Sequence, residues 1–274
     1  MNSIVCRKED IVEENNSSGM VKKEGNNVLT SAEVLAGMSH ELRTHMNAVV
    51  AFSYLLNQNG CSSEERQEFA NQILSSCEHI INLFDNFLDS LIIDGGNSKT
   101  ESGGYSLDNI FDSLLSEFRE TLRREKFKNL VLVTESQYSG ASLEIICDTR
   151  KVAKIIRNLF QNAIQNTRSG YIKVGYYYRD GNITFYILDS GSGFQKSVEF
   201  LNTHNISESL RKFNDLYTAI NLSLTRKLID LMNGTIWAEK NGMNGTGIYF
   251  SIPAIAVNSA NINDKNIPNT MMAI

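Results

Sequence analysis

Residues 38–47 read MSHELRTHMN, and this stretch places an imidazole, His40, beside a carboxylate, Glu41. Mostly apolar side chains recur around it at alternating steps of three and four, namely Leu35, Met38, Leu42, His45, Val49, Phe52 and Leu56. This spacing puts them in one seam along a helix, a pattern typical of helices that pair with other helices. His40 lies off the seam, so we expect its ring to face solvent.

The seam belongs to a predicted helical hairpin. Thr30 and Ser62 each precede a glutamate by three residues, which is the capping-box pattern that begins a helix. Asn59-Gly60 separates the two predicted helices. Two helices cannot bury both of their apolar stripes alone, whereas two hairpins can do so as a four-helix bundle. The sequence therefore predicts a hairpin over residues 30–94 that forms a homodimer.

Beyond this hairpin the pattern changes to mixed helices and strands. Residues 148–166 read as a helix, and the β-rich runs 171–178 and 183–188 are separated by the turn signal Asp180-Gly181. We expect residues 105–253 to form an α/β sandwich, with helices on one face of a mixed sheet, so that the fold class of the whole chain is α+β. The polar residues 1–29 are expected to be flexible and the Asn-rich residues 254–274 to be disordered, too few for a receiver domain.

Composition narrows the classes of function. The 26 Lys and Arg residues are outnumbered by 31 Asp and Glu residues, for a formal net charge of −5, so we expect no binding of nucleic acid. No run approaches the roughly 18 to 20 apolar residues of a membrane helix. The cysteines Cys6, Cys61, Cys77 and Cys147 form no Cys-x-x-Cys pair. We therefore expect reduced thiols in a soluble, cytoplasmic protein.

Two further motifs follow the histidine motif in order. Residues 158–163 read NLFQNA and residues 189–193 read DSGSG. Each motif alone is weak, but the ordered set resembles the catalytic core of a sensor histidine kinase over roughly residues 31–253. The resemblance implies ATP-dependent phosphorylation of His40 and transfer of the phosphoryl group to an aspartate on the receiver domain of a separate response regulator.

The resemblance assigns roles to three residues of the histidine motif. A ring nitrogen of His40 would attack the γ-phosphate of ATP, and Glu41 would orient or deprotonate the ring. Thr44 lies one helical turn beyond His40, and in the family this residue serves the reverse, phosphatase reaction by positioning a water. The alternatives are a surface histidine on a coiled coil and an ordinary exposed threonine.

The other two motifs would hold the nucleotide. Asn158 and Asn162 are four residues apart and share one helical face. By resemblance Asn162 is the Mg²⁺ ligand and Asn158 faces the phosphates, since amide oxygens suit a hard cation. Asp189 would receive the adenine amino group, while Gly191 and Gly193 would let the backbone approach the nucleotide. Helix-surface asparagines and a plain Asp-Ser-Gly turn are the alternatives.

The sequence departs from the family pattern near both sites. His45 stands where the family has a proline, so we expect a straighter helix and a structural histidine that needs a polar partner, not a second phosphate site. Gln165 and Asn166 stand where the family has a basic and then an aromatic residue. A neutral amide does not replace a cation at a phosphate, so we expect weaker nucleotide binding.

The largest departure is the missing second glycine motif. Aligning on the end of the last predicted helix places Ala219-Ile220-Asn221-Leu222 where Gly-x-Gly is expected, and no glycine occurs between Gly193 and Gly234. Two hypotheses follow. The chain is an active histidine kinase with an unusual lid, which the retained His40, Asn162 and Asp189 favour. Alternatively, it is a degenerate relative that binds ATP weakly or not at all and acts as a non-catalytic dimeric phosphotransfer or scaffolding protein.

Overall fold

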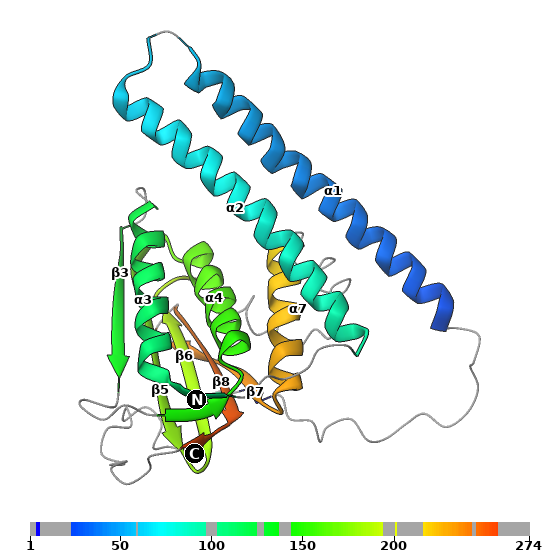
Figure 1. The fold of residues 1–274 in the computed structure, drawn as a ribbon, viewed down its shortest axis with the longest axis vertical. Helices are drawn as coiled ribbons and strands as arrows, with labels where there is room; N and C mark the ends of the chain where they lie inside the picture. Colours follow the sequence, from blue (N-terminus) through cyan, green and yellow to red (C-terminus); the bar gives the residue numbers. More distant parts are fainter. Residues whose placement is uncertain are drawn as a thin grey trace. The chain divides into compact units, whose positions relative to one another are not determined.

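The computed structural model describes residues 4–5, 23–58, 60–96, 103–124, 129–136, 144–193, 201, 216–242 and 245–256. It divides into two compact units, which we describe separately (Figure 1). The helical unit comprises Arg7–Ser98 and Asn202–Lys227. The α/β unit comprises Met1–Cys6, Lys99–Leu201 and Leu228–Ile274.

The helical unit contains a hairpin of two long helices, α1 (Lys23–Leu56) and α2 (Ser63–Asp94) (Figure 1). The predicted capping box at Ser62 is confirmed. The Ser62 hydroxyl accepts from the Glu65 amide at 3.1 Å, and the Ser62 amide donates to the Glu65 carboxylate at 2.8 Å. These bonds satisfy two amides that the first helical turn leaves without a partner, which fixes where α2 begins.

The predicted start of the first helix at Thr30 is wrong, because α1 begins at Lys23. A hydroxyl caps only amides that lack a carbonyl four residues earlier, and the residues before Thr30 are themselves helical. The segment 1–29 is therefore not flexible throughout. Ile4–Val5 form strand β1, and residues 6–22 lie outside the described residues.

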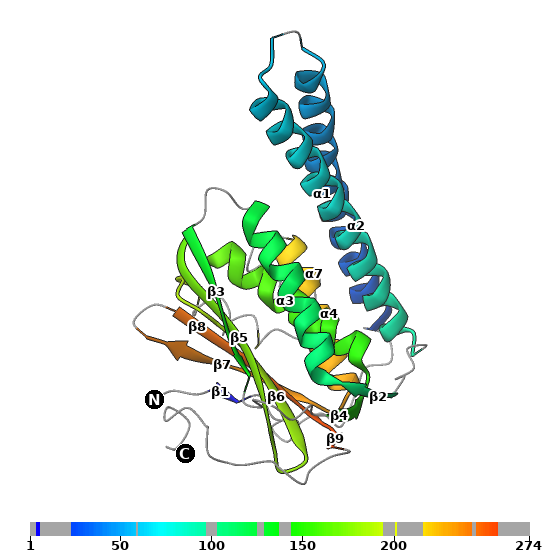
Figure 2. The same ribbon diagram turned by 60° about the vertical axis from the view of Figure 1, so that its left-hand side comes forward.

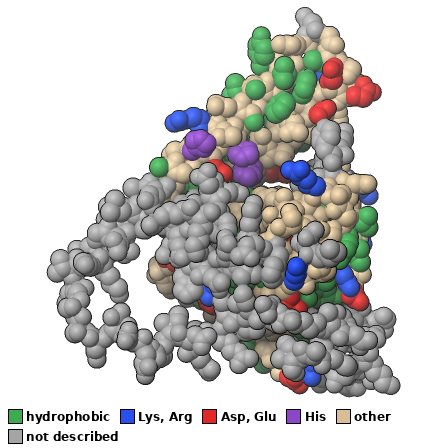
Figure 3. Space-filling model, turned by 180° about the vertical axis from the view of Figure 1, so that it is seen from behind, with side chains coloured by type: hydrophobic (Ala, Val, Ile, Leu, Met, Phe, Trp, Pro, Cys, Tyr) green, Lys and Arg blue, Asp and Glu red, His purple; other side chains and the backbone are tan. Residues whose placement is uncertain are grey.

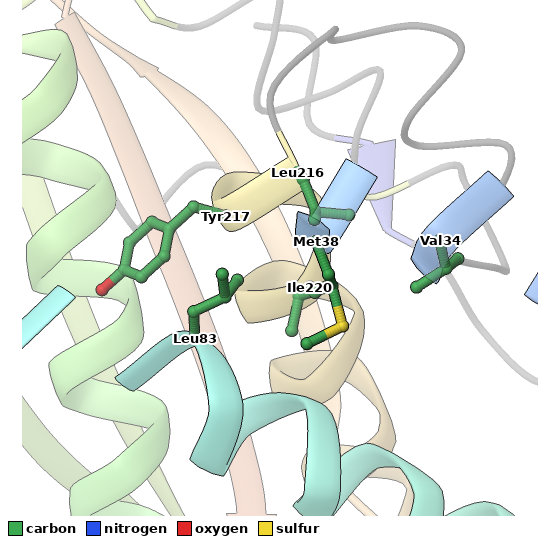
Figure 4. Packing of buried hydrophobic residues seen from close by; sticks show 6 residues of the cluster. All are labelled: Val34, Met38, Leu83, Leu216, Tyr217 and Ile220. Atoms are coloured by element: carbon green, nitrogen blue, oxygen red, sulfur yellow. The ribbon is translucent and has the colours of Figure 1, made fainter. Parts of the chain in front are cut away.

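The seam of α1 packs against α2 and a third helix, α7 (Leu216–Leu231). A cluster of six buried side chains joins them (Figure 4): Val34, Met38, Leu83, Leu216, Tyr217 and Ile220. Leu42 and Phe87 pack against this cluster. Leu35, which was expected on the seam, is instead 54% exposed. With 3.6 residues per turn, the row of residues 34, 38 and 42 faces the cluster and turns position 35 away.

The α/β unit is built on a six-stranded sheet with the order β1-β7-β8-β6-β5-β3. Strand β3 is parallel to β5, and the other neighbours are antiparallel. Helices α3 and α4 lie on one face of this sheet (Figure 2), and the Phe118 and Phe160 rings stack between them at 3.7 Å. The α+β fold class is confirmed. The bounds are α3 (Leu107–Arg124), α4 (Thr149–Asn166), β3 (Asn129–Ser136), β5 (Ser169–Arg179), β6 (Asn182–Asp189), β7 (Thr235–Asn241) and β8 (Gly245–Pro253).

The turn between β5 and β6 forms as the sequence predicts. Asp180 and Gly181 have φ angles of 50° and 77°, and Arg179 pairs with Asn182. Positive φ at both central residues is the requirement of the type I′ turn, whose twist matches that of the strands. The register set by this turn places Asp189 at the end of β6.

A second sheet of three strands has the order β2-β4-β9, with β2 at Gly103–Ser106, β4 at Glu144–Cys147 and β9 at Ile255–Ala256. It corrects two expectations. The α/β unit was expected to begin at residue 105, yet residues 103–106 form a strand before α3 begins. The start of the predicted disordered tail pairs with β4. Short edge strands depend on a distant partner, so the local pattern does not reveal them. Residues 257–274 lie outside the described residues.

None of the helices in the described part of the chain combines the length and the apolar character that crossing a membrane requires.

Candidate functional site

His40 is exposed on α1, as the helical pattern predicts. Thr44 is also exposed, and its hydroxyl donates to the His40 carbonyl at 3.0 Å. This bond within the helix uses the hydroxyl proton and leaves oxygen lone pairs that can accept from water. The structure thus places the imidazole and the hydroxyl on one accessible face of the helix.

The Glu41 carboxylate turns toward α2. Its Oε2 atom lies 3.5 Å from Nε2 of His79, a residue that the sequence did not single out. Adjacent residues on a helix do not face each other, so Glu41 and His40 point in different directions. In this arrangement the Glu41 carboxylate contacts His79, and the predicted role toward His40 requires another rotamer of Glu41.

His45 also faces His79. The two rings stack with their centroids 3.8 Å apart, and His79 stacks in turn on Tyr217 at 4.0 Å. Burial lowers the pKa of His45, and the neighbouring His79 lowers it further, while Glu41 opposes the shift. α1 continues as a helix through His45, where a proline would remove a hydrogen bond.

The two asparagines of the second motif are both buried on α4, with 7% of Asn158 and 8% of Asn162 exposed. The side-chain amide of Asn166 donates to the Asn162 carbonyl at 2.8 Å and to Asn162 Oδ1 at 3.1 Å. The oxygen that the sequence assigns to a metal therefore already accepts a hydrogen bond. Gln165 is exposed.

Asp189 is 3% exposed at the end of β6. Its Oδ1 accepts from the Gly191 amide at 2.8 Å, and its backbone carbonyl accepts from the Asn241 side chain at 2.8 Å. Burial raises the pKa of the Asp189 carboxyl, and backbone hydrogen bonds from Gly191 and Thr246 oppose the shift. A buried carboxylate held in this way is suited to accept from an amino group that enters the site.

The loop after Asp189 lies directly on the end of α4. A Cβ atom on Gly191 would be 2.2 Å from the Asn166 carbonyl oxygen, and one on Gly193 would be 2.9 Å from Asn166 Cγ. Both positions therefore require glycine, because a larger residue would collide with the backbone or the side chain of Asn166. The second and third motifs, which are distant in sequence, meet at Asn166.

Thr246 is a residue of this site that the sequence motifs did not indicate. It is fully buried on β8 opposite Asp189, and its hydroxyl has no hydrogen-bond partner among the described residues. The Thr167 hydroxyl lies close enough to Asp189 to lower that residue's pKa, yet makes no hydrogen bond of ordinary geometry in the described structure. Buried hydroxyls normally have partners, so the Thr246 hydroxyl is available to a polar group that enters this site. The signal in the sequence is Gly245-Thr246-Gly247, small residues at the start of an alternating strand.

The position of the missing glycine motif is helical. Ala219 and Asn221 are buried within α7, and Asn86 on α2 donates to the Asn221 side chain at 2.5 Å. Residues 194–200 and 202–215, which would contain the rest of a lid, lie outside the described residues.

Two family models match the chain. Residues 30–96 match the His Kinase A (phospho-acceptor) domain. Residues 147–256 match the histidine kinase-, DNA gyrase B-, and HSP90-like ATPase.

The chain is also similar in sequence to individual sensor kinases. The chain is 24% identical over 247 residues to the autoinducer 2 sensor kinase/phosphatase LuxQ of Vibrio cholerae, covering 86% of this chain and 28% of the relative. It is 26% identical over 227 residues to the circadian input-output histidine kinase CikA of Synechococcus elongatus, covering 81% and 30%. The chain thus spans less than a third of the length of these relatives.

Solved structures show the same fold. Histidine kinase AdeS of Acinetobacter baumannii superposes with a TM-score of 0.53 at 18% identity, covering 78% of this chain and 97% of that one. Histidine kinase ThkA in complex with response regulator protein TrrA superposes with a TM-score of 0.54 at 20% identity, covering 85% and 64%.

Proposed function

Because the chain belongs to the sensor histidine kinases, we propose that it phosphorylates His40 with ATP and passes the phosphoryl group to an aspartate on a response regulator. The observation that carries this proposal is the pairing, in one chain, of an exposed histidine on a helical hairpin with a buried carboxylate at the edge of an ATPase fold. Such a histidine is accessible both to ATP and to a receiver domain.

The reaction uses the imidazole as a nucleophile. The unprotonated ring nitrogen of His40 attacks the γ-phosphorus, the bond to the β,γ-bridging oxygen breaks, and ADP leaves. Glu41 would hold the proton on the opposite ring nitrogen after turning away from His79. Thr44 would position a water for hydrolysis of the aspartyl-phosphate in the reverse reaction. ThkA, which has the same fold, was solved with a response regulator, and this supports a similar partner here.

We assign the nucleotide site to the junction of α4 and β6. Asp189 would accept from the adenine amino group, with the Thr167 and Thr246 hydroxyls as further polar partners for the base or its water. Gly191 and Gly193 keep this loop on α4, and Asn158 would face the phosphates. The buried Asp189 carboxylate and the Thr246 hydroxyl, which has no partner among the described residues, fit a purine that carries an amino group.

Mg²⁺ would be held by Asn162 Oδ1 together with phosphates and water. A single amide oxygen fits this hard cation, which usually takes few protein ligands and keeps several waters. Such an ion would supply positive charge that neutralises the phosphates. Asn166 donates to the same oxygen, so metal binding competes with an existing hydrogen bond.

We further propose a homodimer joined through the hairpin. Large apolar side chains of α2 are exposed at steps of seven, three, four and three residues: Leu74, Ile81, Phe84, Leu88 and Leu91. Figure 3 shows hydrophobic side chains at the surface of the upper part of the molecule, where Figure 1 places the hairpin. A second copy would cover this heptad stripe as a four-helix bundle.

Light scattering tests the dimer. The wild-type chain should be a dimer at micromolar concentration, and Ile81→Glu should be a monomer because a charge then lies in the stripe. Val131→Glu is the matched control, since Val131 is 60% exposed on β3 outside the hairpin. A monomeric wild type would contradict the proposal.

The alternative of a degenerate, non-catalytic dimer is favoured by the bond from Asn166 to Asn162. Incubation with γ-labelled ATP and Mg²⁺ separates the two. Acid-labile label that is absent from His40→Ala supports the kinase. If no label appears and no nucleotide binds at millimolar ATP, the scaffolding function replaces the kinase function.

The free thiols of Cys61, Cys77 and Cys147 support the further proposal of a reducing, cytoplasmic location.

A further inference from the structure

Three potential metal ligands from two helices converge beside His40. Glu41 and His45 are four residues apart on α1 and therefore share a face, and His79 meets them from α2. One ligand atom from each residue lies within 4.8 Å of the other two. All three are partly buried, so the cluster is both sheltered and reachable from solvent.

We propose that Glu41, His45 and His79 bind a divalent transition-metal ion, with Zn²⁺ as the best match. Two imidazoles and one carboxylate form a His₂Glu set that leaves a fourth position for water, and nitrogen and oxygen ligands of this type suit zinc. This site is separate from the Mg²⁺ position on α4 and goes beyond the proposed function.

The spacing is close to what such an ion requires. With bonds of about 2.0–2.2 Å, two ligands of a tetrahedral zinc lie about 3.4 Å apart. The Glu41 oxygen and the His79 nitrogen are already 3.5 Å apart. The His45 nitrogen must move closer by at most about 1.4 Å on the same geometry, and the two stacked rings would have to rotate to point both lone pairs at one ion.

The surroundings favour the ligating forms of these side chains. Burial lowers the pKa of His45, which favours the neutral form of the ring that a metal ion needs. At 3.5 Å the contact between Glu41 and His79 is at the long end of a hydrogen bond, so a bound ion would replace only a weak interaction. A metal here would join α1 to α2 one residue from His40.

The expected consequence rests on the proposed function. Glu41 is the carboxylate assigned to His40, and a bound ion would hold it facing α2. Zn²⁺ should therefore slow autophosphorylation. His79 also stacks on Tyr217, so turning the ring toward an ion would change a contact between α2 and α7.

Zinc binding is measured first, on the whole chain without ATP, by competition with a chromophoric chelator. The wild type should bind one Zn²⁺ per chain and gain thermal stability. His45→Phe and His79→Phe keep a ring for stacking but remove the ligand, and each should weaken binding at least about tenfold, equal to about 1.4 kcal/mol. His40→Ala, the matched control, should bind like the wild type.

Several results would overturn the site. Both Phe variants could bind Zn²⁺ as tightly as the wild type, or His40→Ala could abolish binding. A Co²⁺-loaded chain could show an intense near-ultraviolet thiolate band, which would place the metal at cysteine instead. Because these readouts need no ATP, an inactive chain that binds zinc would refute the kinase function and leave the metal site standing.

Regulation is tested with labelled ATP. Zn²⁺ should inhibit labelling of the wild type and leave His79→Phe active and insensitive. Equal inhibition of both proteins would mean that Zn²⁺ acts at the nucleotide, and would overturn the regulatory role.

Discussion

The substitution Gly191→Ala tests whether contact between the Asp189 loop and α4 maintains the nucleotide site. The φ angle of Gly191 is outside the left-handed region, so alanine is compatible with the backbone and the effect is purely steric. The new methyl group would lie 2.2 Å from the Asn166 carbonyl oxygen and 2.8 Å from the Asn166 carbonyl carbon. Both neighbours are backbone atoms at the end of a helix, so they cannot move away as a flexible side chain could.

The size of the effect follows from these distances. A carbon normally approaches a carbonyl oxygen to about 3.3 Å, so the loop must move by about 1 Å. That shift would break the bond from the Gly191 amide to Asp189 Oδ1. A hydrogen bond to a charged group contributes about 1.5–3 kcal/mol. We therefore expect ATP affinity to fall about 100-fold, equal to about 2.7 kcal/mol.

Nucleotide titration with Mg²⁺ measures this loss, and thermal denaturation shows that the unit is still folded. Gly37→Ala is the matched control, because the same change in α1 meets only a flexible Leu216 side chain at 3.4 Å. It should leave ATP binding unchanged and stabilise the helix by about 0.5–1 kcal/mol. A folded Gly191→Ala protein with wild-type ATP affinity would show that the contact between the loop and α4 does not maintain the nucleotide site.

Three other changes have defined outcomes. Asp189→Asn should weaken ATP binding by about tenfold or more, since it removes a charged acceptor. The same change should stabilise the nucleotide-free protein at pH 7. Folding raises the pKa of the Asp189 carboxyl from its ordinary value of 3.8, so the wild type loses stability as pH rises from 3.8 through the folded pKa. The denaturation curves of the two proteins should therefore converge toward low pH. Asn166→Ala removes the hydrogen bond to Asn162 Oδ1, which contributes about 0.5–1.5 kcal/mol, so Mg²⁺-dependent ATP binding should tighten up to about tenfold. Weaker binding in a titration would show that this hydrogen bond does not compete with the metal. Ser62→Ala removes a cap and should lower the free energy of unfolding by about 1 kcal/mol in urea denaturation, whereas an unchanged midpoint would show that the capping box does not stabilise the hairpin.

Interactions among neighbouring residues account for the local elements and the three motifs. The capping box at Ser62, the turn at Asp180-Gly181 and the exposed position of His40 follow from interactions among neighbouring residues, which the chain order fixes. The same local reasoning failed at Thr30, where the residues before it extend the helix and leave no free amides to cap.

Which side chains meet across elements depends on how those elements pack together. His79 comes 38 positions after Glu41, and Thr246 comes 57 positions after Asp189, yet helix packing and strand register place each pair together. Periodicity indicates which face of an element is buried, but it does not identify the residue opposite, because that depends on the relative shift of two packed segments. The proposed metal ligands and the missed threonine are both consequences of such pairing.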